Sequence, residues 1–369
     1  LSHPPYDLGF LAWLALVPLF VALNGKTPKQ GFGLGYFFGA AYCFGMFSWL
    51  IHVTLVGMVL FNLYLALYFA LFAALYAFWR ERLASGILQT LVIASSWVAS
   101  EFLRATVLSG FGWACLGHSQ YQILPVLQMA DSVGVFGISF LLVVVNMTAF
   151  YILGQDREKY PVAVWHMIGL STGLLAVALV YGFFALSKNA FLPSESRSLK
   201  VTIIQPNVAQ VEKWASANWD VIMDKLERLS RQAVGKSGDV DMIVWPETSL
   251  PGYRWESPQY FVRARALAKE LKTPILLGAE SRTGEKFFNS AVLISPQGEE
   301  VQRYDKIHLV PFGEFIPLRP FLNFIEYFVP MEDISPGVEH TVFVLGTPKV
   351  GVSALICFED TVRDVSRAM

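Results

Sequence analysis

The chain has 369 residues, of which 54% are hydrophobic, and its mean hydropathy of +0.47 is too high for an ordinary soluble protein. A formal net charge of −1 argues against a nucleic-acid-binding protein, which needs a basic surface. The three cysteines are too few and too scattered for a disulfide framework or a zinc site, and the sequence has no CxxC, HExxH, P-loop or complete GxGxxG motif, so we expect no metal and no cofactor.

Charge is divided unevenly along the chain. Residues 1–187 hold 7 of the 28 lysines and arginines and 6 of the 29 acidic residues, although they make up half of the sequence. A charge-poor half followed by a half of ordinary composition is typical of a membrane region joined to a water-exposed domain. We therefore expect a transmembrane region at residues 1–190 and a separate domain at residues 195–369.

The membrane region contains charge-free runs that are long enough for spanning helices, which need about 20 apolar residues. The first run is short and contains Pro18, and the second contains Gly31, Gly35 and Gly39, a spacing that favours close packing of helices. We place six spans at residues 8–24, 31–52, 57–79, 86–106, 133–153 and 163–187.

Loop charges predict the orientation of these spans. The connections near 53–56 and 107–131 contain no Lys or Arg, whereas the other three connections contain two each, at Lys26, Lys29, Arg80, Arg82, Arg157 and Lys159. Because positive loops stay in the cytoplasm, the domain after the last span lies on the outer face. Glu101 and Arg104, near the outer end of the fourth span, either form a functional pair or pin the long outer loop.

From residue 199 onward, short apolar runs rich in Val and Ile alternate with amphipathic stretches. We expect helices at 219–234 and 259–271, and strands at 201–205, 241–245, 274–278, 291–295 and 350–357. Strands that are apolar on both faces and alternate with helices indicate a layered α/β domain with a buried sheet.

Three phrases of this domain carry reactive groups at the ends of strands, where the sites of α/β sheets form. Glu247 follows a strand in Val-Trp-Pro-Glu-Thr, Lys306 and Glu314 lie in a loop rich in Pro and Gly, and Cys357 ends the last strand. A free thiol has a pKa of about 8.5, so it needs a base in order to attack at neutral pH. A carboxylate can supply that base, and an ammonium can stabilise the oxyanion that forms.

Each of these residues has an ordinary alternative when it is taken alone. Taken alone, Cys357 in an apolar strand fits an inert core thiol, Glu247 fits a solvated loop residue, and Lys306 fits a plain surface charge. Their chemistry therefore depends on whether the three come together.

In this order, the three phrases resemble the Glu–Lys–Cys triad of the nitrilase (carbon–nitrogen hydrolase) superfamily. A multi-span region before such a domain is similar to its membrane-fused branch, the apolipoprotein N-acyltransferases. The resemblance extends over nearly the whole chain, with phrases at 100–104, 109–113, 118–120, 205–207, 308–317 and 356–359. It implies an α-β-β-α sandwich for residues 195–369, after the polytopic α-helical region.

The resemblance also implies a reaction and its residues. A phospholipid acyl chain would form a thioester on Cys357 and pass to the α-amine of a diacylglyceryl-cysteine apolipoprotein. Glu247 would be the general base and Lys306 the oxyanion stabiliser. Supporting or substrate-binding positions would be Trp214, Glu314, Phe358 and Glu359.

Two departures from the family bear on this expectation. Position 358 is commonly Tyr in the family and is Phe here, so a phenol is dispensable or replaced. The family has eight spans and further strands after the nucleophile, so we expect these residues to be a piece of a longer protein that neither folds completely nor acts alone. The whole protein would be a monomer in the bacterial inner membrane, bound to no nucleic acid.

Two other functions fit some of the same features. A membrane-tethered nitrilase-type amidase would use the triad with water as the acceptor and would release free acid. A transporter or binding scaffold would need ionisable residues within its helices, and apart from Glu101 and Arg104 these segments have almost none.

Overall fold

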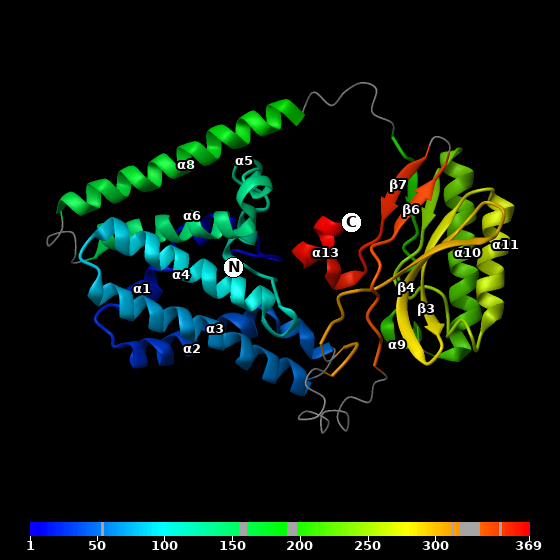
Figure 1. The fold of residues 1–369 in the computed structure, drawn as a ribbon, viewed down its shortest axis with the longest axis horizontal. Helices are drawn as coiled ribbons and strands as arrows, with labels where there is room; N and C mark the ends of the chain where they lie inside the picture. Colours follow the sequence, from blue (N-terminus) through cyan, green and yellow to red (C-terminus); the bar gives the residue numbers. More distant parts are fainter. Residues whose placement is uncertain are drawn as a thin grey trace. The chain divides into compact units, whose positions relative to one another are not determined.

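The computed structural model describes residues 1–52, 55–154, 161–189, 198–213, 215–311, 313–316, 333–346 and 349–369. The chain divides into two compact units, Leu1–Ser194 and Glu195–Met369. The first is built from helices and the second contains the strands (Figure 1).

Four helices of the first unit are long and apolar enough to cross a membrane: α3 (Leu55–Arg82), α4 (Gly86–Thr106), α6 (Ala130–Leu153) and, within α8 (Pro161–Asn189), residues Val164–Lys188. These agree with four of the predicted spans, and they are the helices of a multi-pass membrane protein. The total of six spans stays a prediction.

The other two predicted spans have a different form. Residues 8–24 do not form one helix, because a 3-10 helix, η1 (Gly9–Trp13), is separated from the seven-residue α1 (Val17–Leu23). Pro18 lies in the first turn of α1, where its missing N–H needs no partner. The second predicted span is α2 (Pro28–Met46), which ends before the 3-10 helix η2 (Ser48–His52).

Close packing of α2 on α3 depends on the predicted glycines. A Cβ atom on Gly31 would lie 2.6 Å from the carbonyl oxygen of Ala73, and one on Gly35 would lie 2.6 Å from that of Phe69. Gly39 meets the Phe69 side chain in the same way. The helices can approach this closely only because these residues have no side chain, as the spacing predicted.

Glu101 and Arg104 on α4 both hold the loop that follows the helix. Glu101 Oε1 accepts a hydrogen bond of 2.7 Å from the backbone N–H of Leu116. Arg104 donates to the carbonyl oxygens of Phe111 and Trp113, at 3.1 and 2.6 Å. Of the two alternatives that the sequence left open, these contacts support an anchor for the loop.

The second unit is built on a five-stranded sheet. Its strands pair in the order β1 (Val201–Ile203), β2 (Met242–Val244), β3 (Ile275–Thr283), β4 (Lys286–Ile294) and β5 (Glu300–Asp305). The first three are parallel, and β4 and β5 are antiparallel to their neighbours. A second, two-stranded sheet pairs β6 (Val342–Leu345) with β7 (Val350–Ser353).

Helices cover one face of the large sheet, and the small sheet packs on the other. Alternate residues of the strands face α10 (Trp219–Ser237) and α11 (Pro258–Leu271), with Ile243, Leu277 and Val292 fully buried among them. On the opposite face, Leu276 and Leu293 belong to the cluster that contains Phe343 of β6. The described layers are therefore helix, sheet and sheet, in agreement with the α/β class that the sequence predicted.

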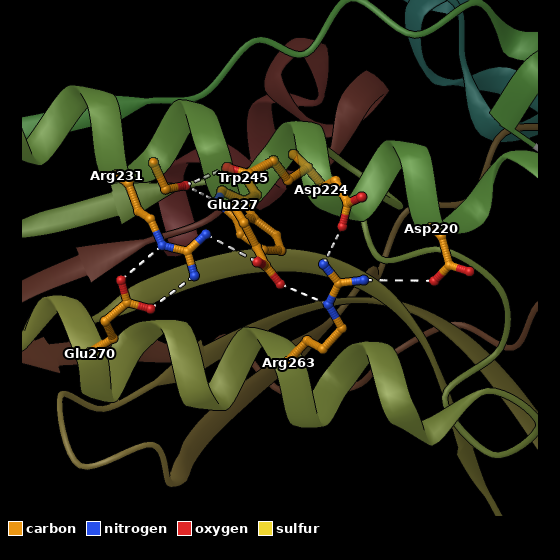
Figure 2. Close-up of polar contacts among 9 residues, drawn as sticks. Asp220, Asp224, Glu227, Arg231, Trp245, Arg263 and Glu270 are labelled. Carbon is orange, nitrogen blue, oxygen red and sulfur yellow. Dashed lines mark hydrogen bonds and ion pairs between the residues drawn. The ribbon is translucent and has the colours of Figure 1, made fainter.

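Ion pairs join the two covering helices along their exposed sides (Figure 2). Arg263 of α11 extends to Asp224 and Glu227 of α10, at 2.5 and 2.8 Å. Arg231 joins Glu227 to Glu270 in the same row. Exposed pairs of this kind contribute at most about 1 kcal/mol each, so the buried apolar cluster beneath them holds the helices.

Both predicted helices of this unit are confirmed, with α10 and α11 ending within a few residues of the expected positions. Two strands were missed, β5 and β6, because both are short and half-exposed and β5 carries charged residues. Cys357 does not lie on the last strand as predicted. β7 ends at Ser353, and Cys357 begins the 3-10 helix η7 (Cys357–Thr361).

Candidate functional site

Glu247 follows β2, where its backbone is fixed against the neighbouring strand. A Cβ atom on Gly278 of β3 would lie 2.6 Å from Glu247 Cα and 2.5 Å from the Thr248 nitrogen, so only glycine fits there. Thr248 has a left-handed backbone with φ of 43°, which a non-glycine residue adopts only at a cost of about 1–3 kcal/mol. The turn thus holds the Glu247 carboxylate in one place at the end of the strand.

Lys306 follows β5, and its side chain is only 1% exposed. Its Nζ donates a hydrogen bond of 2.9 Å to Glu314 Oε1 and lies 3.9 Å from Glu247 Oε1. A surface charge is therefore the wrong interpretation of Lys306. A buried ammonium is held by carboxylates, because an unpaired charge there would be strongly destabilising.

Asn289 of β4 completes this arrangement, although it was not among the residues predicted from the sequence. Its Nδ2 donates to Glu247 Oε1 at 2.7 Å and to Glu314 Oε1 at 3.2 Å, and its side chain is 3% exposed. A buried amide in an otherwise apolar strand was the available signal, but the predicted strand began two residues later, at Ala291.

Lys213 is a second cation that sequence reasoning missed. It ends the short helix α9 (Gln210–Lys213) and donates to the carbonyl oxygen of Glu247 at 3.1 Å and to the hydroxyl of Thr248. Burial lowers the pKa of Lys213, and the carboxylates of Glu247 and Glu280 oppose that shift. Trp214, the next residue and a predicted supporting position, lies outside the described residues.

Cys357 is exposed and has a left-handed backbone with φ of 54°, so it is not a core thiol. Burial of its surroundings and the Glu247 carboxylate raise the pKa of the Cys357 thiol, whereas the Lys306 ammonium lowers it. The resting group is therefore a thiol, which needs a base before it can attack.

Glu359 holds the turn around Cys357 through four hydrogen bonds. It is fully buried, and its Oε1 accepts hydrogen bonds from the Tyr304 hydroxyl and from the backbone N–H groups of Ile307 and His308, at 2.7–3.0 Å. Its Oε2 accepts a bond of 2.9 Å from the N–H of Ile356. One carboxylate thus ties the segment after Lys306 to the segment that carries the thiol.

The structure places the remaining predicted residues beside this group. Glu314 Oε2 accepts a hydrogen bond of 2.8 Å from the N–H of Val310, which orients its other oxygen toward Lys306. Phe358 is buried, and its ring stacks on that of His308 with centroids 5.9 Å apart. No group of three or more His, Cys, Asp and Glu that could hold a metal ion occurs among the described residues.

Two family models match this chain, one in each unit. Residues 1–148 match the family model of the apolipoprotein N-acyltransferase N-terminal domain, and residues 200–369 match that of carbon-nitrogen hydrolases. The structure of an amidase of the nitrilase superfamily from Nesterenkonia AN1 is also similar, with 18% sequence identity and a TM-score of 0.32. The alignment covers 47% of this chain and 63% of the amidase chain.

Two relatives match almost the entire chain. An apolipoprotein N-acyltransferase from Geobacter metallireducens is 37% identical over 100% of this chain and 72% of its own length. One from Vibrio vulnificus is 30% identical over 97% of this chain and 71% of its own length. The chain therefore belongs to the apolipoprotein N-acyltransferase family, and it is an acyltransferase of the nitrilase superfamily.

Proposed function

We propose that this protein transfers an acyl chain from a phospholipid, through a thioester on Cys357, to the α-amine of a diacylglyceryl-cysteine apolipoprotein. The observation that carries the proposal is the buried Lys306 ammonium, 2.9 Å from Glu314 and 3.9 Å from Glu247, within the electrostatic range of an exposed thiol. A cysteine acyltransferase needs this set of groups, namely a thiol, a carboxylate base and an ammonium. The proposed reaction requires no metal or cofactor.

In the first half-reaction, Glu247 takes the proton of the Cys357 thiol as the sulfur attacks the ester carbonyl of the phospholipid. The Lys306 ammonium and the backbone N–H of Phe358 stabilise the negative charge that forms. When the tetrahedral intermediate collapses, the ester C–O bond breaks and the departing lysophospholipid oxygen receives the proton from Glu247. The products are lysophospholipid and the thioester.

In the second half-reaction, the acceptor amine attacks the thioester carbonyl. Glu247 takes a proton from the attacking nitrogen and returns it to the Cys357 sulfur as the C–S bond breaks. Glu314 positions the Lys306 ammonium, and Glu359 positions the turn that carries the thiol. Trp214 and Phe358 remain candidates for substrate contact.

We further propose that the catalytic unit lies on the outer face of the bacterial inner membrane, that the protein is a monomer and that it crosses the membrane with the charge pattern described above. Both substrates are lipids, so a thioester formed next to the bilayer needs no passage through water. The loop charges support the orientation.

A transfer assay separates this function from that of an amidase. Purified full-length enzyme is incubated with phospholipid vesicles and a synthetic diacylglyceryl-cysteine peptide, and the products are weighed by mass spectrometry. We expect a triacylated peptide with a new amide and an equal amount of lysophospholipid. Free fatty acid with no change in the peptide mass would indicate that water is the acceptor and would refute the proposal.

A further inference from the structure

Glu280 lies beside the catalytic groups but has no role in the steps above. It is on β3, directly opposite Asn289 of β4 in the antiparallel ladder. Residues that lie directly opposite point to the same face of a sheet, so Glu280 shares the face on which Asn289 binds Glu247 and Glu314. Its side chain is half-buried, and it was not among the residues predicted from the sequence.

The charges that surround Glu280 come from several elements. Its carboxylate interacts electrostatically with Glu247 after β2, with Glu314 in the loop beyond β5, and with the ammonium groups of Lys213 and Lys306. When all of these are ionised, three carboxylates face two ammonium groups. The set therefore has one negative charge in excess, which favours the binding of one further cation.

Asn289 gives a second and independent indication. Both hydrogen bonds of its Nδ2 are directed to catalytic carboxylates, and its buried Oδ1 has no hydrogen-bond partner among the described residues. An unsatisfied buried carbonyl costs about 1–3 kcal/mol, so it favours a ligand that donates hydrogen bonds. An ammonium group has three donors and no acceptor, which matches the pair of acceptors at Glu280 and Asn289.

The proposed reaction leaves one proton without a destination. An α-amino group has a pKa of roughly 8, so most of the acceptor arrives at neutral pH as an ammonium ion, which cannot attack. It has to lose one proton as its lone pair becomes free to attack and another as the amide forms. Glu247 handles the second, which it returns to the Cys357 sulfur, so the first needs a different base.

We propose that Glu280 binds the α-ammonium group of the acceptor and removes its first proton. In this step the N–H bond breaks, its electron pair stays on nitrogen as the nucleophilic lone pair, and the proton bonds to the Glu280 carboxylate. After the amide has formed, Glu280 releases this proton to water. The inference rests on the function proposed above and assigns Glu280 to the second half-reaction alone.

The acid strength of Glu280 supports this role. Burial raises the pKa of Glu280 to about 7, the negative charges of Glu314 and Glu247 add to the rise, and Lys213 and Lys306 oppose it. An efficient base has a pKa near the working pH. Below pH 7 the carboxylate becomes protonated and can no longer accept the ammonium proton, so transfer should slow as the pH falls.

The test follows the two half-reactions separately in full-length Glu280→Gln enzyme. Acyl-enzyme formation from phosphatidylethanolamine vesicles alone should change far less than transfer, because Glu280 moves no proton in that step. Transfer from preformed acyl-enzyme to a diacylglyceryl-cysteine peptide should lose its acidic limb near pH 7 and acquire one near the pKa of the amine, roughly 8. If the ammonium bound to Glu280 loses its proton as it attacks, and then reacts as fast as the free amine, transfer by the variant at pH 6.5 should be about tenfold slower than in wild type, and above pH 9 the two rates should converge.

Glu285→Gln is the matched control, because Glu285 is an exposed carboxylate in the turn of the same β3–β4 hairpin. It should leave both half-reactions unchanged. Equal slowing of transfer by Glu280→Gln at every pH, or slowing of acyl-enzyme formation as large as that of transfer, would overturn the assignment. Absence of any acyl-enzyme in the wild type would instead refute the proposed function itself.

A measurement on the wild-type enzyme serves if the variant does not fold. Transfer is followed with two acceptor peptides whose α-amines differ in pKa by about one unit, a tenfold difference in free amine. If Glu280 removes the proton as the nitrogen attacks, the rate follows the ionised carboxylate and the acidic limb stays near pH 7 for both peptides. A limb that moves with the pKa of the amine would overturn the proposal.

Discussion

Replacement of Glu359 by Gln tests how the turn around Cys357 is held. The carboxylate is fully buried and accepts four hydrogen bonds, three on Oε1 and one on Oε2. Glutamine can keep the three on its carbonyl oxygen, but its NH₂ group then faces the N–H of Ile356, so two donors meet. Removal of the negative charge also weakens the three bonds that remain.

The size of the effect follows from these contacts. Hydrogen bonds to a charged group contribute about 1.5–3 kcal/mol each and neutral ones about 1, while an unsatisfied buried donor costs about 1–3 kcal/mol. Relief from burying a charge offsets part of the loss. We expect a destabilisation of about 3 kcal/mol, which lowers the melting temperature of a unit of this size by roughly 6–12 °C.

Thermal unfolding of the purified protein, followed by tryptophan fluorescence, measures this shift. Glu339→Gln is the control, since Glu339 is exposed, and it should melt within about 1–2 °C of wild type. If Glu359→Gln melted at the same temperature as Glu339→Gln, the four hydrogen bonds would not be what holds the turn.

Two further predictions concern the buried cation and the topology. Lys306→Arg should lower turnover by a factor of about 10²–10³, nearly as much as Lys306→Ala, because a planar guanidinium cannot take the place of a compact ammonium 2.9 Å from Glu314. Near-normal turnover of this variant in a phospholipid-to-peptide assay would contradict the role of Lys306 as the oxyanion stabiliser. In intact cells, a membrane-impermeant thiol reagent should label a Glu339→Cys variant of a cysteine-free protein but not an Arg157→Cys variant, and the reverse pattern would overturn the orientation.

Local sequence was sufficient for the residues that lie in recognisable phrases. Glu247 and Lys306 each follow a strand, whereas Cys357 was placed at the end of the last strand and instead begins η7, four residues after β7 ends. Gly31, Gly35 and Gly39 likewise indicated a close approach of two helices, since the absence of side chains is a local property.

The residues that were missed depend on contacts that no local pattern encodes. Asn289 and Glu280 become neighbours through the register of β3 and β4, and a shift of that register by one residue would turn both to the other face. Lys213 reaches Glu247 from a helix 34 residues earlier in the chain. The break in the first predicted span is also invisible to hydropathy, which measures apolar length and not helical continuity.

The most direct test of the account is a mass measurement of the intact enzyme after incubation with phospholipid and no acceptor. A ping-pong mechanism predicts one added acyl chain on the peptide that contains Cys357, removable by hydroxylamine, and none in Cys357→Ser or Glu247→Gln. Acylation of the peptide substrate by Cys357→Ser at the wild-type rate, or an acyl chain attached to another residue, would contradict the assignment of Cys357 as the nucleophile.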